Sequence, residues 1–208
     1  MSNITATAVK ELREISGAGM MDCKKALSEA SGNLDEAMDI LRKSGISKAQ
    51  KKSGRSTKEG MIYSYIHPGE KLGVLIEINC ETDFVAKTDD FINLNKNIAM
   101  HIAASAPISV KREDISLDVL ERERDIYAEQ ARQSGKPENI IDKMIEGRVN
   151  KFYQENVLLE QAFVKDPDKT VQDIITDIIA KLSENIVVSR FVRFQLGEQT
   201  NNSTPVDN

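Results

Sequence analysis

Asn79-Cys80-Glu81-Thr82-Asp83-Phe84-Val85-Ala86-Lys87 places an aromatic side chain in a polar segment directly after an apolar one. Residues 72–79 just before it are rich in β-branched side chains and alternate, which predicts a strand with one apolar face of Val74, Ile76 and Ile78. After it, Thr88 supplies the hydroxyl typical of a helix N-cap, and a helical pattern begins. The stretch therefore predicts a corner between a strand and a helix.

Phe84 lies within this corner and admits two interpretations. Most phenylalanine side chains are largely buried, so the local pattern favours a Phe84 that folds back and closes the core. The alternative is an exposed ring that contacts a partner. Residues elsewhere in the chain have to decide between these two structures.

Residues 1–45 are predicted to form a compact unit of three helices, because apolar residues recur at helical spacing in three successive segments. Each pattern is followed by a glycine that is expected to end the helix: Gly17, Gly32 and Gly45. So short a unit buries little surface and is typical of a docking module. Met20 and Met21, beside the first turn, either fill its core or form an adaptable contact.

A basic segment separates this unit from a mixed domain. Residues 46–60 combine Gly, Ser and mostly basic charges, which is typical of a solvated linker. Residues 61–198 contain a predicted hairpin around Pro68-Gly69-Glu70, several helices, and a late strand near 188–196 that returns to the hairpin. The predicted class is α+β, with a small antiparallel sheet packed by helices. Residues 199–208 are expected to form a disordered polar tail.

Composition restricts the function classes. The 208 residues are 40% hydrophobic and 29% charged with a net charge of −5, which suits a globular protein. No apolar run approaches the roughly 20 residues that cross a bilayer and the first residues lack a signal peptide, so we expect a cytoplasmic protein without membrane contact. Cys23 and Cys80 form neither a disulfide framework nor a metal motif. An acidic chain without Trp also lacks the usual features of direct nucleic-acid binding.

Motifs for catalysis are missing from the sequence. It has no phosphate-binding loop and no nucleophile elbow. His67 and His101 have no local metal-ligand or nucleophile partner, and His101 lies beside apolar helical positions, as a packing histidine does. We therefore expect no enzyme, no cofactor and no metal, but a protein that acts through interactions.

Two long stretches identify a family. Residues Thr7 to Leu27, with Ser16-Gly17-Ala18-Gly19-Met20-Met21-Asp22 at their centre, closely resemble the N-terminal module of bacterial translation elongation factor Ts. Residues Glu77 to Lys87 are similar to a second signature of that family. Shorter segments match in order: Met100–Ala104, Ser134–Pro137, Glu146–Arg148 and Phe191–Phe194. The resemblance covers residues 5 to 198.

The resemblance implies a guanine-nucleotide exchange factor for the translational GTPase elongation factor Tu. Its N-terminal module would have a ubiquitin-associated-like fold and dock on the nucleotide-binding domain of the GTPase, with Arg13 and Met20 as expected contacts. The Thr82-Asp83-Phe84-Val85 corner would reach towards the nucleotide and Mg²⁺ site. There Phe84 would act as a wedge and Asp83 would make polar contacts, which favours the exposed interpretation of Phe84.

Long members of this family carry two related core subdomains and a helical coiled-coil insertion. Here the segment after Phe91 runs directly into Asn97–His101, so we expect a short form with a single core. A second copy could cover the edge of its late strand and form a homodimer. Two other function classes stay open, namely a helical docking module for a nascent chain or ubiquitin-like partner, and an RNA-associated ribosomal accessory protein.

Overall fold

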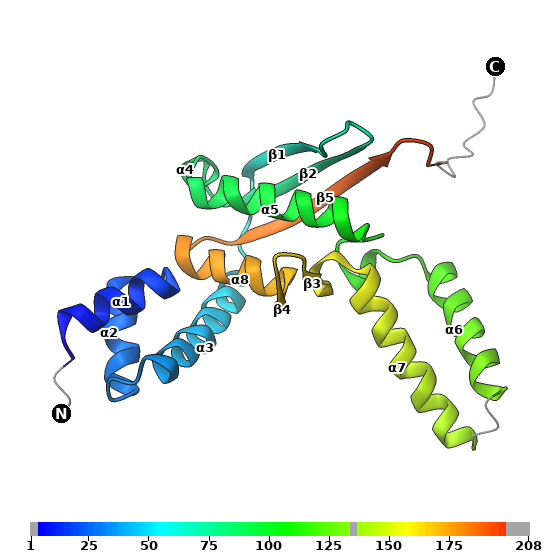
Figure 1. Ribbon diagram of the computed structural model, residues 1–208, viewed down its shortest axis with the longest axis horizontal. Helices are drawn as coiled ribbons and strands as arrows, with labels where there is room; N and C mark the ends of the chain where they lie inside the picture. Colours follow the sequence, from blue (N-terminus) through cyan, green and yellow to red (C-terminus); the bar gives the residue numbers. More distant parts are fainter. Residues whose placement is uncertain (1–3, 134–136, 199–208) are drawn as a thin grey trace.

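Three helices begin the chain in the computed structural model, which describes residues 4–133 and 137–198 (Figure 1). They are α1 (Ala6–Ser16), α2 (Met20–Glu29) and α3 (Leu34–Lys52). Asn33 caps α3 by accepting two backbone N–H groups, and Gly17 ends α1 with a left-handed φ of 65°. Their inner faces form a small core of Val9, Leu12, Cys23, Ala26, Leu27, Ala30 and Ala37. The predicted three helices are thus confirmed.

The third helix is longer than predicted, because Gly45 does not end it. α3 continues to Lys52, so the first half of the expected linker at 46–60 is helical. Gly45 is buried where α3 packs against α8 (Val171–Leu182), and a Cβ atom at position 45 would lie 3.3 Å from the Cβ atom of Ala180. The glycine allows two helices to approach closely, and it was misread as a stop because helix ends also favour glycine.

The sheet has three antiparallel strands in the order β1-β2-β5. β1 (Glu59–Ile66) and β2 (Leu72–Cys80) form the predicted hairpin, and β5 (Ile186–Gln195) pairs with the other side of β2. The prediction that a late strand returns to the hairpin is therefore confirmed. β2 is central, and its inward side chains Val74, Ile76 and Ile78 are buried.

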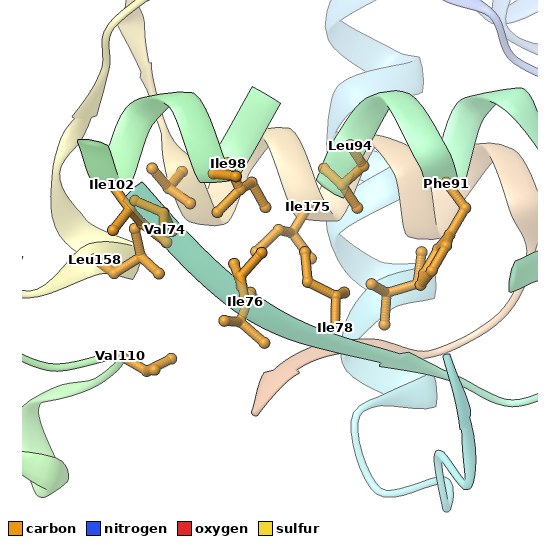
Figure 2. Close-up of a cluster of buried hydrophobic side chains, with 14 of the residues drawn as sticks. Val74, Ile76, Ile78, Phe91, Leu94, Ile98, Ile102, Val110, Leu158 and Ile175 are labelled. Carbon is orange, nitrogen blue, oxygen red and sulfur yellow. The ribbon is translucent and has the colours of Figure 1, made fainter. Parts of the chain in front are cut away.

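Two helices cover the inner face of this sheet, namely α5 (Asp89–Ser105) and α8. Figure 2 shows side chains of α5, α8 and β2 interdigitating. Four apolar residues of α5 lie on one helical face and are all buried: Phe91, Leu94, Ile98 and Ile102. Full burial of each such side chain stabilises the fold by about 1.5–3 kcal/mol, so this layer is the main source of stability.

A helical hairpin projects away from the core (Figure 1). It consists of α6 (Leu117–Arg132) and α7 (Glu138–Asn156), whose existence as helices was predicted. The chain thus does contain a helical insertion, which corrects the expectation of a short form in which the segment after Phe91 runs on without one. The apolar positions of α6 and α7 face the neighbouring helix, as at Ala131 and Val149, and sequence spacing does not reveal which surface an apolar stripe covers.

The remaining elements are short. They are α4 (Asp83–Ala86), β3 (Ala162–Phe163), β4 (Asp166–Thr170) and two 3-10 turns, η1 (Arg112–Asp114) and η2 (Leu158–Glu160). The tail 199–208 and most of the segment Ser134–Pro137 lie outside the described residues. Within the two described ranges, no helix combines the length and apolarity needed to cross a membrane.

His101 is a buried packing histidine, as predicted. Its Nδ1 accepts the backbone N–H of Val164 at 3.3 Å, so the proton lies on Nε2, which is 2.9 Å from Oε1 of Gln161. Burial lowers the pKa of His101. The neutral ring thereby joins α5 to the loop between β3 and β4.

Gly45 provides a test of the packing between α3 and α8. Gly45→Leu should lower the free energy of unfolding by about 1–3 kcal/mol, because the new side chain overpacks the contact with Ala180. Gly147→Leu is the matched control, since α7 leaves position 147 with no atom within 4 Å of a new Cβ. The control should gain about 0.8 kcal/mol from helix propensity. Urea denaturation measures the unfolding free energy of both variants. Equal changes at positions 45 and 147 would contradict the close packing of α3 on α8 at Gly45.

Candidate partner-binding site

The corner after β2 holds Phe84 in solvent. β2 ends at Cys80, and Thr82 caps α4 with its Oγ1 atom, which accepts the N–H of Val85 at 3.4 Å. Val85 and Ala86 pack against the core, whereas Phe84 is 80% exposed. Successive residues of a helical turn point in different directions, so the inward places are taken by Val85 and Ala86. The interpretation of Phe84 as a residue that closes the core is therefore wrong.

An ion pair lies beside the ring. Oδ2 of Asp83 is 2.7 Å from Nζ of Lys87, one helical turn further on. This hydrogen bond holds the pKa of Asp83 below its usual value and raises the pKa of Lys87. Both groups are thus charged near neutral pH, and the corner presents an aromatic ring next to a carboxylate and an ammonium group.

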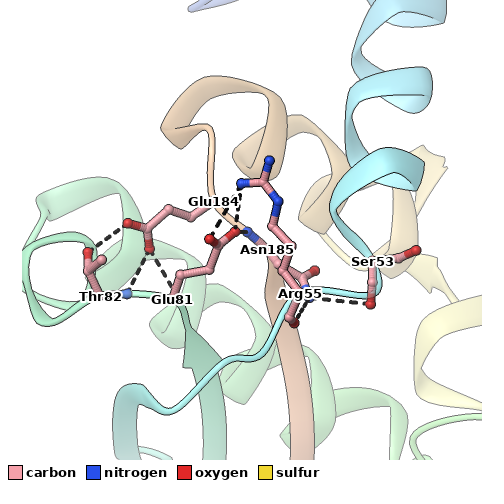
Figure 3. Close-up of polar contacts among 6 residues, drawn as sticks. All are labelled: Ser53, Arg55, Glu81, Thr82, Glu184 and Asn185. Carbon is pink, nitrogen blue, oxygen red and sulfur yellow. Dashed lines mark hydrogen bonds and ion pairs between the residues drawn. The ribbon is translucent and has the colours of Figure 1, made fainter.

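A set of partly buried polar groups supports the corner from the core side (Figure 3). Glu184 accepts hydrogen bonds from Glu81 and Thr82, and Glu81 accepts one from the backbone of Asn185. Sequence reasoning missed Glu184 and Asn185, because they are far from the corner in the chain. The signal was the pairing of two predicted strands, since the register Cys80↔Ile186 places the residues next to each strand end side by side.

A second exposed apolar surface lies where α1 meets α2. Arg13 is exposed in the last turn of α1, Met20 is 57% exposed and Met21 is 75% exposed. The two methionines therefore do not fill the core of the helical unit, which was the other interpretation. Ile15 is exposed beside them and, like Met21, was not among the predicted contacts.

Lys181 of α8 lies between this surface and the first turn of α5. A Cβ atom at Gly17 would lie 3.6 Å from Cδ of Lys181, so the lysine stem passes the turn between α1 and α2. Its Nζ is 2.7 Å from Oδ1 of Asp90, in the first turn of α5 that follows α4. In Figure 1 both α4 and the α1–α2 corner lie towards the left, away from α6 and α7.

The chemistry of the corner is that of recognition. Burial raises the pKa of the Cys80 thiol to about 11, so this group stays protonated near neutral pH and is a poor nucleophile. An exposed aromatic ring and adjacent methionines are side chains that anchor interfaces. Exposed side chains of this kind on one side of the molecule are typical of proteins that dock onto another macromolecule.

Comparison with known proteins gives the family. The family model described as Elongation factor TS matches residues 1–198. The chain is 55% identical to elongation factor Ts of Syntrophobacter fumaroxidans over 196 residues, which span 94% of this chain and 98% of that protein. It is 59% identical to elongation factor Ts of Fervidobacterium nodosum and 57% identical to that of Thermosipho melanesiensis, over 94% of this chain and 99% and 100% of those proteins. The chain belongs to the elongation factor Ts family, and its role is in translation elongation.

The exposure of Phe84 predicts how stability responds to its truncation. Phe84→Ala should change the free energy of unfolding by less than about 0.5 kcal/mol, because the ring makes few contacts within the chain. Phe91→Ala is the matched control in the buried layer and should lose about 3–5 kcal/mol through the cavity that it leaves. Chemical denaturation of both variants checks this. A large loss of unfolding free energy for Phe84→Ala would show that the ring packs in the core.

Proposed function

We propose that this protein is a guanine-nucleotide exchange factor that promotes GDP release from the translational GTPase elongation factor Tu in the cytoplasm. The observation that carries the proposal is the ring of Phe84, which is 80% exposed in a chain of the elongation factor Ts family. The corner that carries this ring is hydrogen-bonded to Glu184. The Thr82-Asp83-Phe84-Val85 corner inserts near the nucleotide and Mg²⁺ site of the GTPase. Asp83 contributes polar contacts there.

Exchange of this kind requires no chemical step in the factor. Coupling between two ligands is reciprocal, so a factor that binds the nucleotide-free GTPase more tightly than the GDP form weakens GDP binding by the same ratio. Burial of one Phe side chain contributes about 1.5–3 kcal/mol. If that burial occurs only as GDP leaves, it accelerates release by roughly one to two powers of ten. The proposed factor thus works as a binding protein, without a cofactor or a metal of its own.

We assign the first contact to the N-terminal module, residues 1–45, and the wedge to the core domain, residues 61–198. Arg13 and Met20 contact the nucleotide-binding domain of the GTPase, and Met21 and Ile15 extend the same apolar surface. Methionine side chains adapt to an uneven surface, which suits docking. This division gives the two surfaces separate tasks, affinity for the module and nucleotide release for the corner.

Release of fluorescent GDP from the GTPase tests this function. Phe84→Ala should slow the maximal rate at saturating factor roughly 10- to 100-fold. Met20→Ala should raise the factor concentration that gives half the maximal rate, with little change in the maximum. Leu117→Ala is the control, because Leu117 is also a well-exposed apolar residue but lies on α6. An unchanged maximal rate for folded Phe84→Ala would reject the wedge.

We also propose that a second copy covers the outer face of the sheet. Among the described residues, helices cover only the inner face of the sheet. The outer face exposes apolar side chains from all three strands, Ile62, Ile66, Leu75, Val192 and Phe194, and Leu196 is exposed directly after β5. Apolar patches of this kind on a sheet mark an interaction surface. β5 is an edge strand as well, so two copies related by a two-fold axis can bury the same patch on both sides.

Multi-angle light scattering tests the homodimer. The free protein should show twice the mass of one chain, and Phe194→Asp should give the mass of one chain because a charge is costly in an apolar interface. Leu117→Asp is the control on α6 and should keep the mass of the unsubstituted protein. A monomer mass for the unsubstituted protein at micromolar concentration would reject the dimer.

A further inference from the structure

Glu184 occupies the short connection between α8 and β5, and its carboxylate points at the corner (Figure 3). Oε2 accepts the backbone N–H of Glu81 at 3.1 Å and that of Thr82 at 3.0 Å. Oε1 accepts the hydroxyl proton of Thr82 at 2.6 Å. One partly buried side chain thus receives three hydrogen bonds from two consecutive residues, and none of these residues is the exposed Phe84.

These hydrogen bonds meet a local need. A helix of only four residues, such as α4, is too short to be stable alone, so its backbone depends on contacts with the rest of the chain. Glu184 accepts two of the N–H groups between the end of β2 and the first turn of α4. Because Thr82 donates its hydroxyl proton to Glu184, the lone pairs of Oγ1 are available for the N–H of Val85. Glu184 therefore sets the orientation of the cap.

The same cluster ties the corner to the rest of the chain. Oε1 of Glu81 accepts the N–H of Asn185 at 2.7 Å. Asn185 is 3% exposed, and its Nδ2 donates to the backbone carbonyls of Arg55 at 2.9 Å and Ser53 at 3.5 Å. Ser53 and Arg55 directly follow α3. The corner, the start of β5 and the end of α3 are thus held by one set of hydrogen bonds.

We propose that Glu184 is a positioning residue that fixes the backbone from Thr82 to Ala86, so that Phe84 is ordered before the partner arrives. Phe84 makes little contact with its own chain, so its placement depends on the backbone beneath it. A wedge that is already ordered loses less conformational entropy on binding, and more of its burial energy remains for nucleotide release. The consequence for exchange rests on the function proposed above, whereas the ordering of the corner is a property of the free protein.

Nucleotide release by variants of Glu184 tests the consequence. Glu184→Ala should lower the maximal rate of GDP release roughly tenfold, because charge-assisted hydrogen bonds are lost. The maximal rate of Glu184→Gln should lie between those of the unsubstituted protein and Glu184→Ala, since its amide oxygen still accepts an N–H. Asp177→Ala is the control of equal charge change on α8, where it removes only an exposed ion pair with Lys169, and it should stay within about twofold of the unsubstituted protein. Equal rates for Glu184→Ala and Asp177→Ala would overturn the proposal.

A double-mutant cycle separates positioning from a general loss of stability. If Glu184 acts through the ring, then Glu184→Ala should change the rate less than about twofold when Phe84 is already Ala, because the two residues share one effect. If the double variant instead shows the product of the two single reductions in rate, Glu184 acts independently of Phe84 and the proposal fails.

Amide hydrogen exchange of the free protein tests the ordering without any GTPase. In Glu184→Ala, the amides of Thr82 and Val85 should exchange at least about tenfold faster, whereas the buried α5 amides of Leu94 and Ile98 should be unchanged. Unchanged exchange at the corner would overturn the positioning role. Faster exchange at the corner, in a protein that does not accelerate GDP release, would instead support the positioning role and reject the exchange function.

Discussion

The antiparallel pairing of β2 with β5 is the contact on which the rest of the structure depends. It joins residues 72–80 to residues 186–195, and the long intervening segment must therefore close back on the hairpin. The pairing sets which side of β2 faces α5 and α8, and hence which side chains form the core. It also brings the end of one strand beside the beginning of the other, which places Glu184 next to Thr82. A shift of the register between β2 and β5 by one residue would turn the buried side chains outward and separate Glu184 from Thr82.

The corner departs from local rules in a way that suggests function. An exposed Phe contributes little to folding, and a four-residue helix needs support from other elements. Features that conflict with stability, yet are well supported by the surrounding structure, tend to lie at functional sites. Here the supporting groups come from β2, from the connection before β5 and from the chain after α3. The energy for holding the ring in place is thus supplied by residues that need not touch a partner.

Glycine and apolar periodicity show the limits of local signals. Gly17 and Gly45 are alike in sequence, but the first adopts a left-handed conformation that ends a helix and the second permits close packing inside one. Likewise, apolar spacing is consistent with the helices α6 and α7, but it did not reveal that each packs against the other. The periodicity of a stripe defines the face of a helix that is apolar, but many different surfaces could cover that face.

The sequence by itself determined the three N-terminal helices, the hairpin, the inward faces of β2 and α5, and the family, because these follow from short-range periodicity, turn residues and two long motifs. For Phe84 the local pattern favoured burial, whereas the family resemblance favoured the exposed ring that the structure shows. Only the tertiary structure showed that Val85 and Ala86 take the inward positions and that Glu184, more than a hundred residues away in the chain, accepts hydrogen bonds from the corner. It also showed that β5 leaves its apolar face uncovered. These features depend on the pairing of strands that are far apart in the chain. A local pattern carries no information about which distant residues will lie opposite a given strand.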